Sequence, residues 1–240
     1  MGSRFFEGLT PADVVTLVNA LIGFLAVITA PIDIELAARL ILLAAVADGV
    51  DGVLARRFGG SHIGPYLDSL ADVSSFALAP AVLVFFYLQD ATLGFDHAGV
   101  LTFAVAGVFV AFAVLRLGVY SVYDTAASQT VGVPTTLAGT LLAASLLTVH
   151  AIPVVLLVGT ATVSLLMVSP IEYPDLLARD AVIMGVIHVL AVLFPFFYGR
   201  VFPYALITLA ILYLTLSPWL YWGESERRLR TPPSAKGKRS

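Results

Sequence analysis

Runs of apolar residues long enough to cross a bilayer follow one another along most of this chain. A transmembrane helix needs about 20 predominantly apolar residues, and here 59% of the residues are hydrophobic whereas only 12% are charged. We therefore predict an all-α fold, a polytopic membrane helical bundle with about eight transmembrane helices, six being the alternative. The predicted spans cover residues 13–30, 34–56, 66–88, 98–118, 133–149, 151–168, 180–198 and 202–222.

Two features of these runs affect the count. The fifth and sixth runs are short and are separated only by a segment containing His150 and Pro153. They form either a tight pair of helices or one kinked helix. The second and third runs contain acidic residues, so a strict hydropathy window is expected to miss spans there.

The basic residues predict the orientation and the domain boundary. With eight spans, all 13 Lys and Arg residues fall on one side except Arg39 and Arg200. Because basic residues concentrate in cytoplasmic loops, both termini and the turn between the second and third spans should be cytoplasmic, in a multi-pass protein of the cell membrane. We expect one domain over residues 1–223 and a basic, disordered cytoplasmic tail over residues 224–240.

Four aspartates stand where the second predicted span meets the third. Asp48 and Asp51 end one apolar run, and Asp68 and Asp72 open the next. On a helix the first pair is separated by about 60° and the second by about 40°, so each pair occupies one helical face. A short glycine-rich turn joins the two helices as antiparallel neighbours. The four carboxylates are therefore expected to converge.

Four carboxylates inside a membrane carry a free-energy cost that must be offset. Each costs about 2.5–3.5 kcal/mol at a helix centre, so four approach about 10–14 kcal/mol as an upper value. Protonation or bound cations offset this cost, because Arg56 and Arg57 can neutralise only one or two acids. Ligands that are all oxygen favour Mg²⁺, Mn²⁺ or Ca²⁺. Two metal ions with bridging carboxylates would suit four acids and indicate phosphoryl transfer.

The composition narrows the chemistry further. The chain has no cysteine, which excludes disulfides, cysteine-ligated zinc and thiol nucleophiles. Its net charge of −3 gives no basis for nucleic acid as a partner. Gly49, Gly52 and Ala55 remove side chains from the helix around the acids, so a bulky ligand can approach the backbone. For any single one of these glycines, close helix packing is the alternative.

The residues around the acids resemble the signature of the CDP-alcohol phosphatidyltransferases. The pattern is Asp-x-x-Asp-Gly-x-x-Ala-Arg, followed by Gly-x-x-x-Asp-x-x-x-Asp. The matching positions are Asp48, Asp51, Gly52, Ala55, Arg56, Gly64, Asp68 and Asp72. The resemblance implies a membrane enzyme in which a CDP-linked lipid and a small alcohol exchange at phosphorus, giving a phospholipid and CMP.

The resemblance also implies a role for each residue of the motif. The first three aspartates would be metal ligands, whereas Asp72 would contact a second metal ion and act as general base on the acceptor hydroxyl. The small residues Gly52, Ala55 and Gly64 would border the cytidine, and Arg56 would contact the diphosphate. The family further implies two divalent ions, Mg²⁺ or Mn²⁺, and a homodimer.

Three further stretches extend the resemblance, two of them toward the phosphatidylserine (or archaetidylserine) synthase branch. They comprise residues 11–23, residues 115–120 with 131–135, and residues 166–174. Within the first, Asn19 would line the head-group site or make a packing hydrogen bond. Val119 and Ser121 stand where that branch has a second arginine and an asparagine, and both departures argue against serine specificity. Arg116 remains the candidate partner of a carboxylate or phosphate, the alternative being a basic anchor at the end of the fourth span.

We therefore expect metal-dependent transfer of a phosphatidyl or archaetidyl group from a CDP-lipid to the hydroxyl of L-serine. The alternative is the same reaction with inositol phosphate or glycerol phosphate, whose phosphate predicts a more basic pocket than Arg56, Arg57 and Arg116 supply. A cation transporter is a remote alternative, since it explains the carboxylates but not the interleaved glycine, alanine and arginine.

Overall fold

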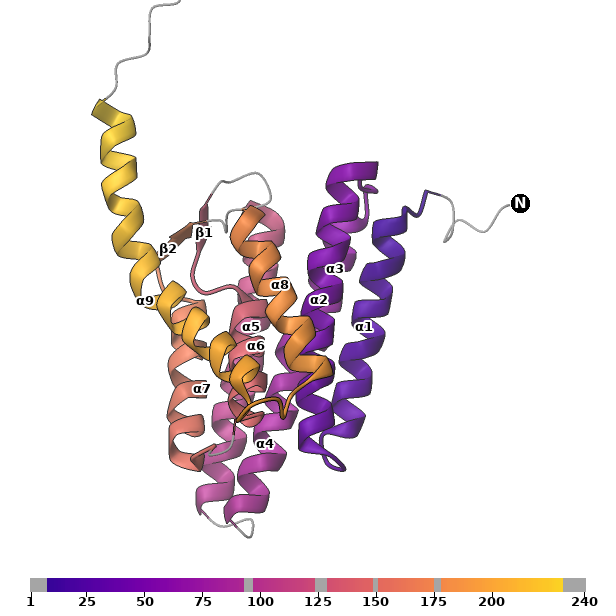
Figure 1. The fold of residues 1–240 in the computed structure, drawn as a ribbon, viewed down its shortest axis with the longest axis vertical. Coiled ribbons are helices and arrows are strands. Elements are labelled where there is room, and N and C mark those ends of the chain that lie inside the picture. Colours follow the sequence, from indigo (N-terminus) through magenta and orange to yellow (C-terminus); the bar gives the residue numbers. More distant parts are fainter. Residues whose placement is uncertain (1–7, 93–96, 124–128, 149–150, 175–177, 231–240) are drawn as a thin grey trace, which may run out of the picture.

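The computed structural model describes residues 8–92, 97–123, 129–148, 151–174 and 178–230. These residues form a bundle of helices with one short strand pair (Figure 1). The helices are α1 (Pro11–Thr29), α2 (Ile34–Phe58), α3 (Gly64–Asp72), the π-helix η1 (Val73–Leu78), α4 (Ala79–Thr92), α5 (His97–Tyr123), α6 (Thr135–Leu146), α7 (Pro153–Met167), α8 (Ala178–Leu193) and α9 (Val201–Arg230). Because α3, η1 and α4 are continuous, the described part of the chain contains one helical segment at each predicted span.

The prediction of an all-α membrane bundle is confirmed. Within the described residues, three helical segments are long and apolar enough to cross a membrane: Pro11–Thr29, Gly64–Ala91 and Gly99–Val122. Four shorter apolar helices follow, within α6, α7, α8 and α9. The second span does not meet these criteria of length, hydropathy and charge, as expected, because α2 carries too many charged residues. The third span is detected in spite of its acids.

The structure decides between the two alternatives for the fifth and sixth runs and corrects the end of the seventh span. The fifth and sixth runs form two separate helices, α6 and α7. The seventh span was predicted to reach residue 198, but α8 ends at Leu193 because Pro195 cannot continue the hydrogen-bond ladder.

α9 continues to Arg230, past the predicted start of the tail at residue 224. Residues 231–240 lie outside the described chain, where disorder stays a prediction.

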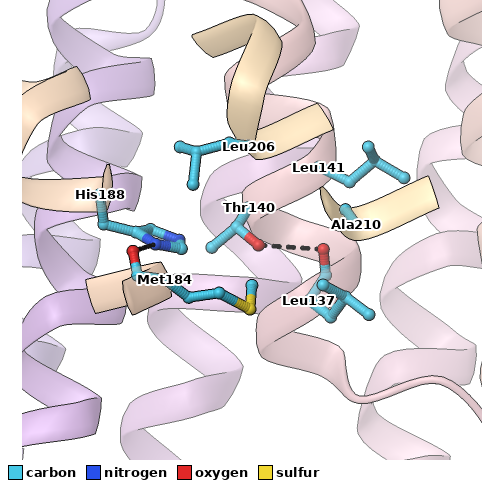
Figure 2. A pocket seen from close by; sticks show the side chains of 7 residues that line it. All are labelled: Leu137, Thr140, Leu141, Met184, His188, Leu206 and Ala210. Atoms are coloured by element: carbon cyan, nitrogen blue, oxygen red, sulfur yellow. Dashed lines mark hydrogen bonds between the residues drawn. The ribbon is translucent and has the colours of Figure 1, made fainter. Parts of the chain in front are cut away.

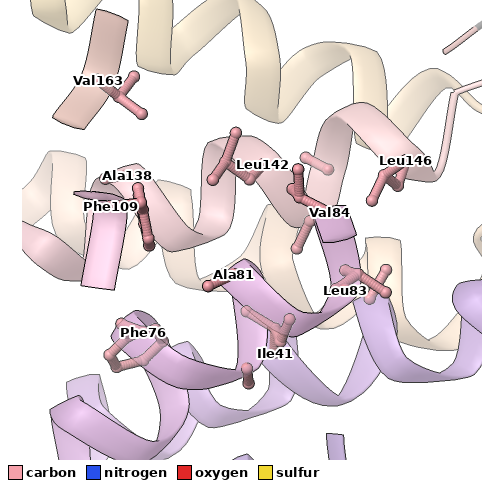
Figure 3. Packing of buried hydrophobic residues seen from close by; sticks show 14 of the residues in the cluster. Ile41, Phe76, Ala81, Leu83, Val84, Phe109, Ala138, Leu142, Leu146 and Val163 are labelled. Atoms are coloured by element: carbon pink, nitrogen blue, oxygen red, sulfur yellow. The ribbon is translucent and has the colours of Figure 1, made fainter. Parts of the chain in front are cut away.

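The core lies where α2, the η1–α4 segment, α5 and α6 cross (Figure 3). Large side chains such as Ile41, Phe76, Leu83 and Phe109 are fully buried there. Small residues let the helices approach. A Cβ on Gly139 of α6 would lie 3.2 Å from the Cα of Phe76 in η1. This close packing fixes η1, and therefore the end of α3, against α6.

A short antiparallel ribbon closes the end of the bundle at which α6 begins (Figure 1). It pairs β1 (Gln129–Val131) with β2 (Glu172–Pro174), and Thr130 lies opposite Tyr173. Tyr173 is buried and stacks on Tyr213 of α9, with ring centroids 5.8 Å apart. The sequence pattern did not predict these strands.

Candidate active site

Three of the predicted aspartates meet at the junction of α2 and α3. Asp48, Asp68 and Asp72 each place one carboxylate oxygen within 4.8 Å of the other two. Asp72 is buried, and its Oδ1 has no hydrogen-bond partner among the residues that the structure describes. Asp48 and Asp68 are half-buried. A buried carboxylate oxygen without a partner is costly, and three anionic groups at this separation repel one another. The donor set therefore suits a hard divalent cation.

Asp51 lies beside this cluster and is held by α1. The hydroxyl of Thr16 donates a hydrogen bond to Asp51 Oδ2 at 2.7 Å, and both residues are only 5% exposed. The charge of Asp51 still acts on the other three carboxylates. The predicted convergence is thus found for three acids, with the fourth adjacent and bound to another helix.

Sequence reasoning singled out Asn19 on α1 but missed Asp13 and Thr16. Asp13 is buried and accepts hydrogen bonds from the backbone amide of Thr10 (2.6 Å) and from the hydroxyl of Ser61 (2.9 Å). This carboxylate therefore ties the turn between α2 and α3 to the start of α1. Asp13, Thr16 and Asn19 follow one another at intervals of three residues in an otherwise apolar helix. That polar stripe is the signal that could have identified Asp13 and Thr16.

Asn19 lies on the same stripe and is completely buried. Neither Oδ1 nor Nδ2 of its amide has a hydrogen-bond partner among the described residues. Its backbone carbonyl accepts a hydrogen bond from the Ser75 hydroxyl of η1 at 2.9 Å. The packing hydrogen bond considered for the Asn19 side chain is therefore not made.

The residues predicted to contact the nucleotide lie at the end of α2 and the start of α3. A Cβ on Gly52 would lie 3.5 Å from Nη1 of Arg56, so the arginine extends over the glycine. Ala55 is half-buried, and Arg56 is exposed. A Cβ on Gly64 would lie 3.3 Å from the Asp13 carboxylate, so this position packs closely against α1.

Arg116 comes from α5 and reaches the first turn of α6. Its guanidinium donates to the Thr135 hydroxyl at 3.2 Å and lies 5.6 Å from the centre of the Tyr120 ring. The positive charge acts on Asp72. The next residue of α6, Thr136, interacts with the Asp48 carboxylate. Arg116 is therefore placed between the ribbon end of the bundle and the aspartate cluster.

The two departures from the serine synthase pattern have different environments. Val119 is 44% exposed, so an arginine at this position would start from the outer surface of α5. The hydroxyl of Ser121 lies 2.6 Å from that of Ser69, which stands between Asp68 and Asp72 on α3. Ser121 thus joins α5 to the helix that carries two of the acids.

A separate pocket between α6, α8 and α9 contains about 190 Å³ of space not filled by atoms (Figure 2). His188 is 8% exposed, and its Nδ1 lies 2.8 Å from the Met184 carbonyl, so Nδ1 is the donor. Its Nε2 has no hydrogen-bond partner in the described part of the chain. The pocket includes no carboxylate. Its lining residues are Leu137, Thr140, Leu141, Met184, His188, Leu206 and Ala210.

Comparison with known proteins agrees with this geometry. The chain is 32% identical over 167 residues to the archaetidylserine synthase of Methanothermobacter thermautotrophicus, covering 68% of each protein. It is 30% identical to the CDP-diacylglycerol–serine O-phosphatidyltransferase of Bacillus subtilis, over 67% of this chain and 87% of that protein. The CDP-diacylglycerol–serine O-phosphatidyltransferase of Methanocaldococcus jannaschii is 38% identical over 78 residues, which cover 32% of this chain and 36% of that protein. Residues 9–223 match the profile of the CDP-alcohol phosphatidyltransferases, and the chain therefore belongs to that family.

Proposed function

We propose that this enzyme transfers a phosphatidyl or archaetidyl group from a CDP-lipid to the hydroxyl of L-serine and releases CMP. The observation that carries the proposal is the cluster of Asp48, Asp68 and Asp72, whose carboxylate oxygens lie within 4.8 Å of one another at the family motif. The acceptor is inferred from the relatives, since their names specify serine transfer or archaetidylserine synthesis.

Members of the family use divalent metal ions, and the residues present fit such ions. All candidate ligands are carboxylate oxygens, and the buried Asp72 Oδ1 lacks any other partner within the described segments. We assign Asp48, Asp51 and Asp68 as metal ligands, with Asp72 contacting a second ion. Mg²⁺ or Mn²⁺ is proposed for both sites, with Ca²⁺ as the alternative. When bound, the ions would neutralise the diphosphate and stabilise the departing CMP.

Asp72 would take the proton from the serine hydroxyl. The serine oxygen then forms a bond to the phosphorus that carries the lipid, and the bond from this phosphorus to the CMP oxygen breaks. The electron pair of the broken bond leaves with CMP. A serine hydroxyl is a weak nucleophile at neutral pH, so a positioned base contributes about 10²–10⁴-fold to the rate. The buried position of Asp72 keeps the proton acceptor away from bulk water.

The remaining motif residues would bind the two substrates. Gly52, Ala55 and Gly64 would border the cytidine, and Arg56, which extends over Gly52, would contact the diphosphate. Arg116 would bind the serine carboxylate, because the fork of a guanidinium matches a planar oxyanion. The unpartnered amide of Asn19 is assigned to the acceptor side of the site.

We further propose that residues 1–223 form the catalytic domain, that the chain is a homodimer, and that the aspartate cluster and both termini face the cytoplasm. Arg39 and Arg200, the two basic residues expected on the opposite side of the membrane, support this orientation. Both make contacts within the protein at the end of α2 that lies away from the acids. Arg39 donates to the Val192 carbonyl at 2.8 Å. Arg200 pairs with Glu35 at 2.8 Å and donates to the Leu147 carbonyl at 2.7 Å.

CMP release from purified protein tests the assignment. The assay supplies CDP-diacylglycerol or CDP-archaeol with Mg²⁺ or Mn²⁺, and then L-serine, inositol phosphate or glycerol phosphate in turn. We expect CMP with serine. No CMP with any acceptor would refute the enzymatic function, and release with inositol phosphate alone would refute the serine assignment.

A further inference from the structure

One contact to the acidic cluster comes from a helix outside the family motif. Thr16 of α1 donates to Asp51 Oδ2 at 2.7 Å across a buried helix interface. The same hydroxyl lies 3.1 Å from the Ala12 carbonyl, the usual local partner of a helical threonine. Since a hydroxyl has one proton, the shorter distance identifies the carboxylate as the principal acceptor.

We propose that Thr16 is a positioning residue, whose hydroxyl fixes the Asp51 carboxylate in the orientation in which it binds a metal ion. This inference rests on the proposed function. It assigns to α1 a role in the metal site that the motif on α2 and α3 does not contain. Hydrogen bonds from outer residues to metal-binding carboxylates typically change metal affinity by about 10–100-fold.

The charges around Asp51 explain why its carboxylate needs a hydrogen-bond donor. Asp48 and Asp68 lie close enough for electrostatic repulsion of Asp51. Asp13, one turn before Thr16 on α1, acts on Asp51 in the same sense. Without a donor on α1, this repulsion would favour rotation of the Asp51 side chain away from the cluster.

The position of Thr16 is itself well fixed. One turn earlier, Asp13 caps the helix through Thr10 and binds the turn between α2 and α3 through Ser61. Two turns later, Gly23 packs so closely on η1 that a Cβ there would lie 2.7 Å from the Cα of Ser75. The hydroxyl of Thr16 therefore lies between two contacts that fix the position of α1 against the helices that carry the acids.

The test is a Mn²⁺ titration of purified, substrate-free protein, followed by electron paramagnetic resonance of the unbound ion. Thr16→Val removes the hydroxyl and keeps the shape, and should weaken Mn²⁺ binding by about tenfold or more. Thr16→Ser keeps the hydroxyl and should stay within about threefold of the wild type. Thr29→Val is the matched control, because Thr29 lies on the same helix and donates only to the Leu25 carbonyl, at 2.7 Å.

Each outcome decides the matter. Unchanged Mn²⁺ affinity in Thr16→Val would overturn the inference, and so would a Thr16→Ser protein as weak as Thr16→Val. If Thr16→Val does not fold, Thr16→Ala must show the same loss of affinity, or the inference is overturned. In an Asp51→Asn background, Thr16→Val should cause no further loss. A wild-type protein that binds no Mn²⁺ would instead overturn the proposed metal-dependent function.

Discussion

The guanidinium of Arg116 and the hydroxyl of Thr135 are joined by a hydrogen bond of 3.2 Å, which attaches α5 to the first residue of α6. Thr136, the next residue, interacts with Asp48, and the charge of Arg116 acts on Asp72. One helical turn thus connects the candidate acceptor-binding residue with two of the acids. A change at Arg116 should consequently alter acceptor binding more than nucleotide binding.

Arg116→Lys should raise the KM for serine by about tenfold or more, with a smaller effect on the KM for CDP-lipid. Lysine keeps the charge but cannot form the two parallel hydrogen bonds of a guanidinium with a carboxylate. Steady-state CMP release at varied serine and varied CDP-lipid measures both constants. Arg57→Lys is the control, since Arg57 lies over the Phe58 ring at 5.5 Å at the exposed end of α2. Equal KM values for serine in Arg116→Lys and the wild type would contradict the assignment.

Asp72→Asn should reduce turnover by about 10²–10⁴-fold, because an amide cannot accept the proton of the serine hydroxyl. Binding of CDP-lipid should be largely retained, since the other three acids and the nucleotide-binding residues are intact. Single-turnover CMP release and equilibrium binding of CDP-lipid separate the two effects. Asp90→Asn, an exposed change on α4, is the matched control. Lost binding with normal turnover of the bound fraction would contradict the role as base.

Asp68→Asn should stabilise the metal-free protein while removing its response to metal. Asp68 faces repulsion from Asp51 and Asp48 and is partly desolvated. In EDTA the melting temperature of Asp68→Asn should therefore exceed that of the wild type. Added Mn²⁺ should raise the melting temperature of the wild type, because a ligand of the folded state stabilises it, and should leave Asp68→Asn nearly unchanged. Thermal unfolding in detergent checks both points. A lower melting temperature for Asp68→Asn than for the wild type in EDTA would show that repulsion between the carboxylates does not dominate the effect of Asp68 on stability.

Gly132→Ala should destabilise the ribbon end of the bundle. Gly132 has φ of 74°, and a Cβ there would lie 2.9 Å from the carbonyl carbon of Met167. The backbone strain alone is worth about 1–3 kcal/mol, and the contact with Met167 adds to it. Gly107→Ala on α5, where an added Cβ meets nothing within 4 Å, is the control. A melting temperature for Gly132→Ala equal to that of the control would argue against this account.

His188→Leu should leave stability unchanged or raise it by up to about 1–3 kcal/mol, because it removes a buried acceptor that lacks a partner. The pocket beside His188 accommodates an apolar side chain, since leucines 137, 141 and 206 already line it. Chemical or thermal unfolding of the purified protein measures the change. A large loss of stability would show that Nε2 binds a buried donor in the folded protein.

The helices and the approach of the acids could be predicted because both depend on local spacing. Apolar runs of spanning length indicate where helices form, and the intervals from Asp48 to Asp51 and from Asp68 to Asp72 put each pair on one face. The position of Arg116 near the cluster was anticipated through resemblance rather than through its spacing.

The other features of the site and the fold depend on contacts between segments that are distant in the sequence. Thr16 meets Asp51 only because α1 packs along α2, and no local pattern encodes that pairing. The three-residue strands β1 and β2 are too short for a recognisable alternation. The hydrogen bond that Asp51 accepts from Thr16 crosses from α2 to α1, so the motif alone could not predict it.

The π-helix η1 begins directly after Asp72, and the amide of Ala79 bonds to the carbonyl of Ser74, five residues earlier. The wider turn accommodates an extra residue between α3 and α4. The periodicity of apolar residues on α4 consequently need not run in phase with the spacing of Asp68 and Asp72. The buried face of α4, with Leu83 and Val84, can therefore pack into the core without rotating Asp68 and Asp72 away from Asp48.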